Sequence, residues 1–265
     1  MSSPTKASGA AGSAPAPDDR RAVACYVYGI VPEDVEISAD AVGVGDPPGR
    51  IQLVRHGEVA ALVSDVNVDR PLGRAQDLVA HELLLDEAAA EVPVLPLRFG
   101  AVLTTPEAVV EELLAPHHDQ FAAALKEIDG RAQFVLKARY AERPVLTEVL
   151  NESQEARRLR DRIRSLPEDA TRNERIRLGE VITQVIAAKR EADTQAVVDR
   201  FGDCTVAATV REPSHERDAA HIAFLVENER QADFEEAIEE LRDDWGDRVE
   251  VRMLGPMAPY DFVVT

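Results

Sequence analysis

Residue types that could bind a metal ion are grouped in two short stretches. His117, His118 and Asp119 are adjacent, but neighbouring side chains on a helix point in divergent directions and do not converge on one ion. Residues 235–244 are dense in carboxylates. Calcium loops alternate their oxygen ligands around a glycine turn, whereas this run has a helical pattern. We therefore interpret both stretches as solvated helix surfaces and predict no metal site.

Signatures of nucleophilic or phosphate chemistry are missing from the sequence. Residues 43–49 are rich in glycine and proline but lack the Lys-Ser/Thr ending of a phosphate-binding loop. There is no Gly-x-Ser-x-Gly elbow. Cys25 and Cys204 each lie in an apolar run without a second ligand at chelating spacing, which favours buried free thiols. The sequence predicts no catalytic residue and no cofactor.

Arg98 is the residue whose setting suggests recognition. It lies beside Phe99 within residues 91–100 (EVPVLPLRFG), a nearly continuous apolar run that predicts a central strand covered on both faces. Pro93 and Pro96 require that strand to be short or bulged. A guanidinium in such a run must pair with a carboxylate, cap carbonyls or reach solvent. A structural arginine with an acidic partner and a recognition arginine at a surface edge both fit.

Length and charge limit the functions open to this chain. Its 265 residues suffice for two domains, and 45% apolar residues can form substantial cores. The 49 acidic and 30 basic residues give a net charge of −19, which repels nucleic acids and anionic membranes. The sequence contains no signal core and no apolar span of about 20 residues. We expect a cytoplasmic protein that binds neither nucleic acid nor membrane.

The first half of the chain predicts a mixed α/β sheet domain over residues 21–130, preceded by a disordered tail over residues 1–20 that is rich in Ser, Ala, Pro and Gly. Its strands are expected at 21–31, 51–55 and 58–64, and its helices at 74–91 and 106–128. Tyr26 and Tyr28 should share one face of the first strand. Thr105 is expected to cap the second helix, and Pro116 to break or kink it.

The second half predicts a ferredoxin-like domain over residues 131–254. Strands are expected at 133–140, 204–210, 220–226 and 249–254, and helices at 144–166, 171–200 and 230–245. This order is the split βαβ arrangement with its first helix doubled into a long antiparallel hairpin. Acids interleave with the hairpin arginines, which favours solvated faces over an RNA-binding patch. The predicted fold class is therefore α+β with two domains.

Three short motifs occur in a fixed order along the chain. They are YVYGIV at residues 26–31, VLPLRFG at residues 94–100 and GPMAPYDFV at residues 255–263. Together they resemble the GvpL/GvpF family of gas vesicle accessory proteins, over about residues 22–264. The closing motif differs from the usual family pattern, which has an aromatic residue and a proline where this chain has Met257 and Ala258.

This resemblance implies a protein, not known as an enzyme, that is needed to assemble gas vesicles, the gas-filled protein shells that give cells buoyancy. It implies contact with the small hydrophobic shell protein GvpA and other accessory proteins, and association with the vesicle. Residues 255–265 are expected to form a strap on the N-terminal domain. We hypothesise that Arg98, Phe99, Tyr260 and Phe262 bind a partner or position the domains. A small-molecule-binding or acylphosphatase-like ferredoxin-fold enzyme remains the alternative.

Overall fold

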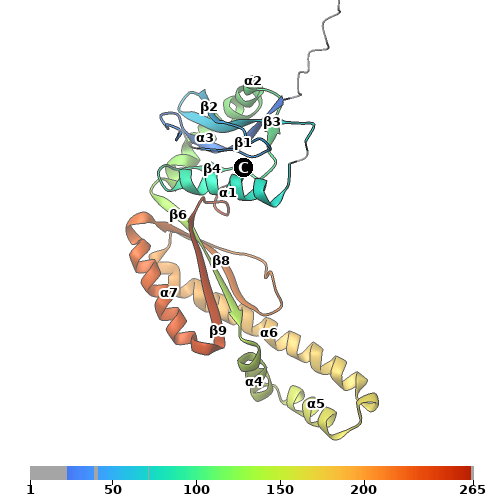
Figure 1. Ribbon diagram of the computed structural model, residues 1–265. Coiled ribbons are helices and arrows are strands. Elements are labelled where there is room, and N and C mark those ends of the chain that lie inside the picture. Colours follow the sequence, from blue (N-terminus) through green and yellow to red (C-terminus); the bar gives the residue numbers. More distant parts are fainter. Residues whose placement is uncertain (1–22, 39–40, 71, 264–265) are drawn as a thin grey trace, which may run out of the picture.

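The described residues form an elongated molecule with two antiparallel sheets (Figure 1). This computed structural model describes residues 23–38, 41–70 and 72–263. The tail predicted over residues 1–20 lies outside the described residues. Helix α1, Ala75–Ala89, lies between the N-terminal sheet and the C-terminal sheet (Figure 1).

The N-terminal sheet is organised around its first strand. The order is β2-β3-β1-β4, and β5 also pairs with β1. The strands are β1 Val23–Pro32, β2 Ile51–His56, β3 Val59–Asn67, β4 Leu95–Pro96 and β5 Val102–Leu103. The strands predicted at 51–55 and 58–64 are present as β2 and β3, which pair antiparallel. Side chains from Ala24 to Val31 are buried along β1, as expected for a strand covered on both faces.

The prediction that residues 91–100 form the central strand is wrong. That stretch contributes only the two residues of β4, which pair with β1 at the edge of the β2-β3-β1-β4 order. The reason is local, because Pro93 and Pro96 have no N–H group for a ladder. Val94 and Leu95 are nevertheless buried, so the apolar run is core-filling loop rather than strand.

Each face of β1 packs against a different helical layer. Tyr26 and Tyr28 share one face, as predicted, with ring centroids 4.7 Å apart, and pack with Leu85 of α1. Val27 and Ile30 pack against the π-helical segment Val109–Leu114 and α3 Ala115–Ile128. The short helix α2, Pro106–Ala108, leads into that segment. Thr105 caps α2 as predicted, since its Oγ1 accepts from the Ala108 N–H at 3.2 Å. The irregularity expected at Pro116 takes the form of that π-helical segment.

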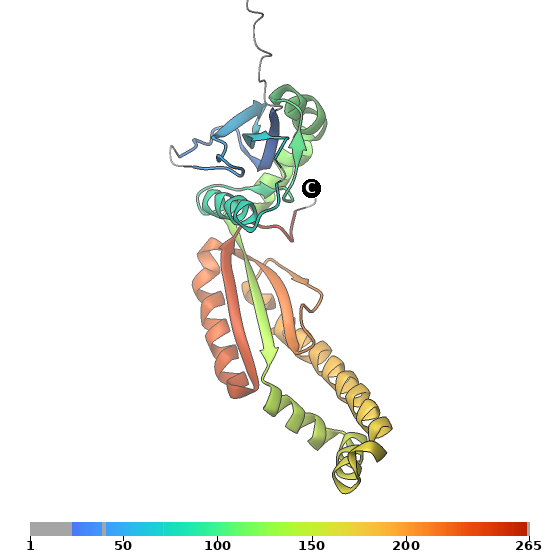
Figure 2. The same ribbon diagram turned by 45° about the vertical axis from the view of Figure 1, so that its right-hand side comes forward.

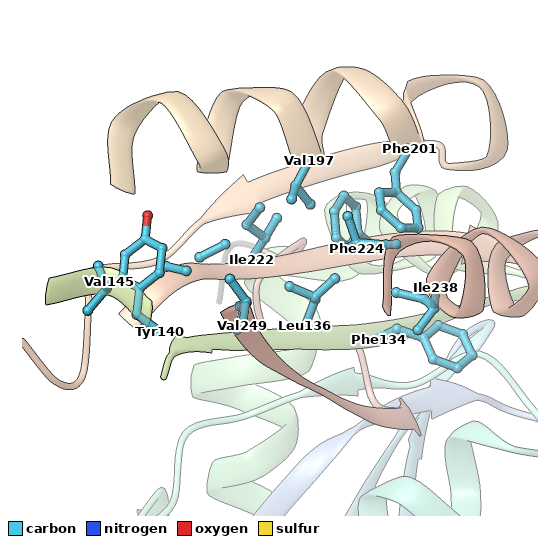
Figure 3. Packing of buried hydrophobic residues seen from close by; sticks show 14 of the residues in the cluster. Phe134, Leu136, Tyr140, Val145, Val197, Phe201, Ile222, Phe224, Ile238 and Val249 are labelled. Atoms are coloured by element: carbon cyan, nitrogen blue, oxygen red, sulfur yellow. The ribbon is translucent and has the colours of Figure 1, made fainter. Parts of the chain in front are cut away.

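The C-terminal sheet has the order β7-β8-β6-β9. Its strands are β6 Arg131–Tyr140, β7 Ala207–Val210, β8 Asp218–Glu227 and β9 Val249–Met257. Helices α6 Arg172–Phe201 and α7 Gln231–Trp245 pack on it. Figure 3 shows Phe201 of α6 against Phe224 of β8, and Ile238 of α7 near Phe134 of β6. Within this core the rings of Phe134, Phe201, Phe224 and Phe234 contact one another.

Three sequence predictions for this half need correction. The helix expected at 144–166 is two helices, α4 Glu142–Glu152 and α5 Gln154–Ser165, because Ser153 caps α5 by accepting from the Ala156 N–H at 3.1 Å. Strand β7 begins at Ala207 and not at 204, because Gly202–Cys204 form a 3-10 turn. Strand β9 runs to Met257, beyond the end predicted at 254. Helices α5 and α6 form the predicted hairpin, which extends away from the C-terminal sheet (Figure 2).

Candidate partner-binding site

The closing segment, residues 258–263, fastens onto the N-terminal sheet. Ala258 is fully buried in the core that contains Tyr26 and Tyr28, and its N–H donates to Asp86 Oδ1 of α1 at 2.9 Å. Tyr260 packs against the same core, and Val263 packs against the core on the other face of β1. The segment therefore contacts both apolar layers of the N-terminal half.

The same segment is tied to the C-terminal sheet through Asp261. Its N–H donates to the side-chain oxygen of Gln133 on β6 at 2.9 Å. Its carboxylate accepts two bonds from Arg211, which follows β7, including one from Nε at 2.9 Å. Bidentate arginine–carboxylate bonds fix orientation as well as distance. Residues 258–263 thus link the two halves by apolar contacts on one side and charged hydrogen bonds on the other.

The loop that carries Arg98 is held from beneath by a buried hydrogen-bond chain. The Gly100 N–H donates to Tyr26 Oη at 3.0 Å, so the phenol proton is directed to His81 Nδ1, also at 3.0 Å. His81 Nδ1 is then the acceptor, and its Nε2–H donates to the Leu97 carbonyl at 3.1 Å. This assignment satisfies every polar atom in the chain with a neutral imidazole.

Burial keeps this chain of hydrogen bonds uncharged. It lowers the pKa of His81, against the opposing effect of the bond to Leu97, and it raises the pKa of Tyr26 to about 12. In this assignment both ring nitrogens of His81 and the Tyr26 hydroxyl are paired within the fold. Their position beneath the loop indicates that they hold its backbone.

The buried Tyr28 hydroxyl holds the loop that contains Gly43 and Val44. Tyr28 Oη accepts from the Val44 N–H at 2.7 Å and bonds Ser64 Oγ at 2.8 Å. Gly43 is required here, because a Cβ on it would lie 2.3 Å from Tyr28 Oη. Asp77, near the start of α1, accepts from three backbone N–H groups, those of residues 45, 73 and 74. These groups too are paired within the fold.

The four predicted site residues lie around this junction in different environments. Phe99 is half-buried, with its ring 5.9 Å from Tyr26 and 5.6 Å from His81. Tyr260 and Phe262 are half-buried, and Tyr260 packs on the same cluster as Phe99. Arg98 is exposed and makes no hydrogen bond or ion pair with any described residue. The structure thus brings Phe99 and Tyr260 to one core. It leaves the Arg98 guanidinium exposed, without a partner among the described residues.

Sequence reasoning missed the polar residues that build the junction. His81 lies within the helix predicted at 74–91, and a histidine in such a helix together with two buried tyrosines is a signal for a buried hydrogen-bond network. Asp86 occupies the same helix with no pattern that distinguishes it from a surface carboxylate. Arg211 and Asp261 are 50 residues apart, and their pairing has no local signature.

Within the part of the chain that the structure describes, no three His, Cys, Asp or Glu side chains converge as a metal ion would require. His117 and His118 make separate contacts, with Phe121 and with the Glu58 N–H respectively. No helix formed by the described residues combines the length and the apolar character needed to cross a membrane.

Comparison with known proteins decides the family. The model of the gas vesicle synthesis protein GvpL/GvpF family matches residues 24–264. The chain belongs to this family. The GvpL/GvpF match spans all three motifs recognised in the sequence, and membership makes the chain one of the gas vesicle accessory proteins.

Individual members of the GvpL/GvpF family agree over nearly their whole length. Gas vesicle protein F of Streptomyces sp. (strain CB03234) is 32% identical over 242 residues, which cover 90% of this chain and 98% of the relative. Gas vesicle protein L of the same strain is 28% identical over 89% of this chain and 91% of the relative. The crystal structure of GvpF from Anabaena sp. PCC7120 has a TM-score of 0.73 at 24% identity, covering 91% of this chain and 95% of that one. The last likeness supports the α+β fold.

Proposed function

We propose that this protein is a non-enzymatic assembly factor that binds the shell protein GvpA and other accessory proteins while gas vesicles form. The observation that carries the proposal is the family match over residues 24–264. A chain with a net charge of −19 suits the role, because mutual repulsion keeps complexes with a sticky shell subunit dispersed. We place its work in the cytoplasm, in association with the vesicle.

We further propose that the two sheets are the cores of two domains, over residues 21–130 and 131–257, joined by the strap, which begins at Ala258 after the end of β9. The strand order β7-β8-β6-β9 and the chain order β6, helices, β7, β8, α7, β9 support a ferredoxin-like second domain. Strand β6 leads into α4 through Ala141 alone. That connection leaves little room for a phosphate-binding loop, which weighs against the acylphosphatase-like alternative.

The four junction residues have separate roles in this proposal. Phe99, Tyr260 and Phe262 position the two domains through the core and the strap. Arg98, exposed and unpaired among the described residues, contacts a partner carboxylate or carbonyl. A surface arginine contributes little to folding, so its removal should affect binding more than stability.

Co-purification with the shell protein tests the function directly. The full chain carrying an affinity tag is incubated with GvpA, and retention of GvpA is compared with a tag-only control. Arg98→Ala is expected to weaken retention without changing the melting temperature. Arg143→Ala, another exposed arginine without a described side-chain partner, is the matched control. An Arg98→Ala variant with wild-type retention and melting temperature would remove Arg98 from the proposal.

A thermal-shift screen against metals, nucleotides and metabolites tests the non-enzymatic part. A ligand that binds only the folded chain raises its melting temperature with concentration. We expect no such shift. A large shift with one compound would favour a small-molecule function instead.

A further inference from the structure

A groove of about 670 Å³ lies beside α1 on the N-terminal half. One wall is formed by residues 34–38 and Ala41, and the other by the last turns of α1 and the residues that follow. The floor is apolar, with Ile51 of β2, Leu62 of β3 and Leu84 of α1 all buried. Half-buried Val35 and Ile37 add aliphatic surface to the first wall.

The rim of this groove carries charge of one sign. Among the described residues that line it, four are exposed carboxylates, two on each wall: Asp34, Glu36, Glu87 and Glu91. No Lys, Arg or His is found among its described lining residues. An apolar floor between acidic walls is complementary to aliphatic side chains flanked by cations, and it opposes anionic ligands.

The wall formed by residues 34–38 is held in place from β2. Arg55 donates from Nε to the Glu33 carbonyl at 2.9 Å and from Nη2 to the Val35 carbonyl at 3.3 Å. The exposure of this wall alternates, since Val35 and Ile37 are half-buried whereas Glu36 is exposed. The groove is therefore a formed feature of the fold with a defined acidic and apolar pattern.

An exposed apolar strip on α1 continues from the groove. Val79 and Leu83 are 60% and 55% exposed, and they precede Glu87 at successive four-residue intervals. Residues four apart lie on one face of a helix, so the strip leads directly to the groove rim. Contiguous exposed apolar surface beside a formed groove is typical of protein-interaction sites.

We infer that this groove is a docking site on the assembly factor for a short amphipathic segment of the shell protein, with aliphatic side chains flanked by Lys or Arg. The inference rests on the proposed function and names the surface to which the shell protein binds. The aliphatic side chains fill the floor over Ile51, Leu62 and Leu84, and the cations face the carboxylates of both walls. This is helix-in-groove or extended-segment recognition, in which apolar anchors give affinity and charge gives orientation.

The test reverses the charge of one wall in the full-length protein. Glu87→Arg with Glu91→Arg changes the α1 wall, and both side chains are exposed. Arginine near the C-terminal end of a helix is favourable for the helix dipole, so the variant should fold. The matched control, Glu236→Arg with Asp243→Arg on α7, makes the same charge change at exposed positions remote from the groove.

Titration with purified GvpA at low and high salt gives the readout. We expect the groove variant to bind about tenfold more weakly than wild type at low salt, with a smaller difference at high salt because ions screen the rim charges. The control variant should bind like wild type. Hydrogen exchange of the wild-type complex should show protection at residues 34–38 and 84–92, independently of any variant.

The outcomes separate the groove from the proposed function. If the groove variant binds GvpA as tightly as the wild type, and the wild-type complex shows no protection at residues 34–38 and 84–92, the groove is not the docking site. The proposed assembly function would then stand. Absence of GvpA binding by the wild type would overturn both. The protein could also self-associate in the absence of GvpA. If the groove variant abolished that self-association, the groove would bind a second copy of the chain, and the inference would be overturned.

Discussion

The two halves of this molecule fill their cores in different ways. The N-terminal core contains Tyr26, Tyr28 and His81, and each of their polar atoms bonds a loop or another side chain. The C-terminal core instead centres on four phenyl rings with centroids 5.2–5.5 Å apart, from Phe134, Phe201, Phe224 and Phe234. Its hydrogen-bonded charges lie at the margin, where Arg248 bonds Glu148 at 2.8 Å and Asp193 at 2.7 Å.

The two cores therefore differ in role: the C-terminal rings mainly stabilise a sheet, whereas the N-terminal polar groups also position loops. The four rings stabilise the C-terminal sheet mainly by burying apolar area. The directional bonds of this half are made by other residues, such as Asp218, which accepts from the Ser214 and His215 N–H groups. Hydrogen bonds are directional, so the N-terminal core fixes the backbone at Val44, Leu97 and Gly100. The exposed Arg98 and the acidic groove both lie on the half whose loops are held in this way.

The largest expected effect comes from the ring cluster. Phe224 is fully buried and contacts Phe201 and Phe234, so Phe224→Ala should lower the free energy of unfolding by about 3–5 kcal/mol through lost burial and a cavity. Chemical denaturation measures it. Val210→Ala on exposed β7 is the control, with an expected change of roughly 0.5 kcal/mol or less. A loss of similar size in both variants would refute the ring cluster as the source of stability.

A smaller but more specific effect is expected from Tyr28→Phe. Removing the hydroxyl leaves the buried Val44 N–H and Ser64 Oγ without this partner, which should cost about 1–3 kcal/mol. The exchange of the Val44 amide should accelerate in hydrogen-exchange measurements. Adding Ser64→Ala should recover part of the loss, because one of the stranded groups is then removed. If Val44 exchanged no faster, the directional role of this core would be wrong.

Local patterns in the sequence predicted much of the fold. The spacing of apolar residues located α1, α6 and α7, and the alternation of tyrosines placed Tyr26 and Tyr28 on one face. The same reasoning failed for residues 91–100, because a continuous apolar run is equally consistent with a buried strand and a buried loop. The break at Ser153 was missed because a serine at that point is unremarkable until its cap is seen.

The candidate sites were harder to predict because they depend on distant segments. The groove joins residues 34–38 to α1, and the strap joins Asp261 to Arg211 and Gln133. Periodicity describes one element at a time and carries no information about which loops meet. The motif containing Arg98 marked one loop at this junction, but the bonds from the loop backbone to Tyr26 and His81 became evident only in three dimensions.

The pH dependence of folding stability tests whether His81 is neutral in the N-terminal core. Because burial lowers the pKa of His81, the unfolded chain binds this proton below about pH 6.5 while the folded chain does not. Stability should therefore fall as the pH drops through that range, by at most about 1.4 kcal/mol per pH unit. His81→Gln removes the titrating group and should flatten this slope, whatever its effect on absolute stability. An unchanged slope would mean that His81 is not the neutral link assigned to it.

The smallest effect should come from the contact that joins the two halves. Asp261 and Arg211 are partly exposed, so solvent screens their bonds, and Asp261→Ala should cost only about 1 kcal/mol. Arg211→Ala should cost a similar amount, and the double variant little more, because either change removes the same interaction. Both changes should increase proteolysis of the strap while the two cores remain folded. Additive losses would instead show that Arg211 and Asp261 act independently, and the charged link assigned to them between the two halves would be wrong.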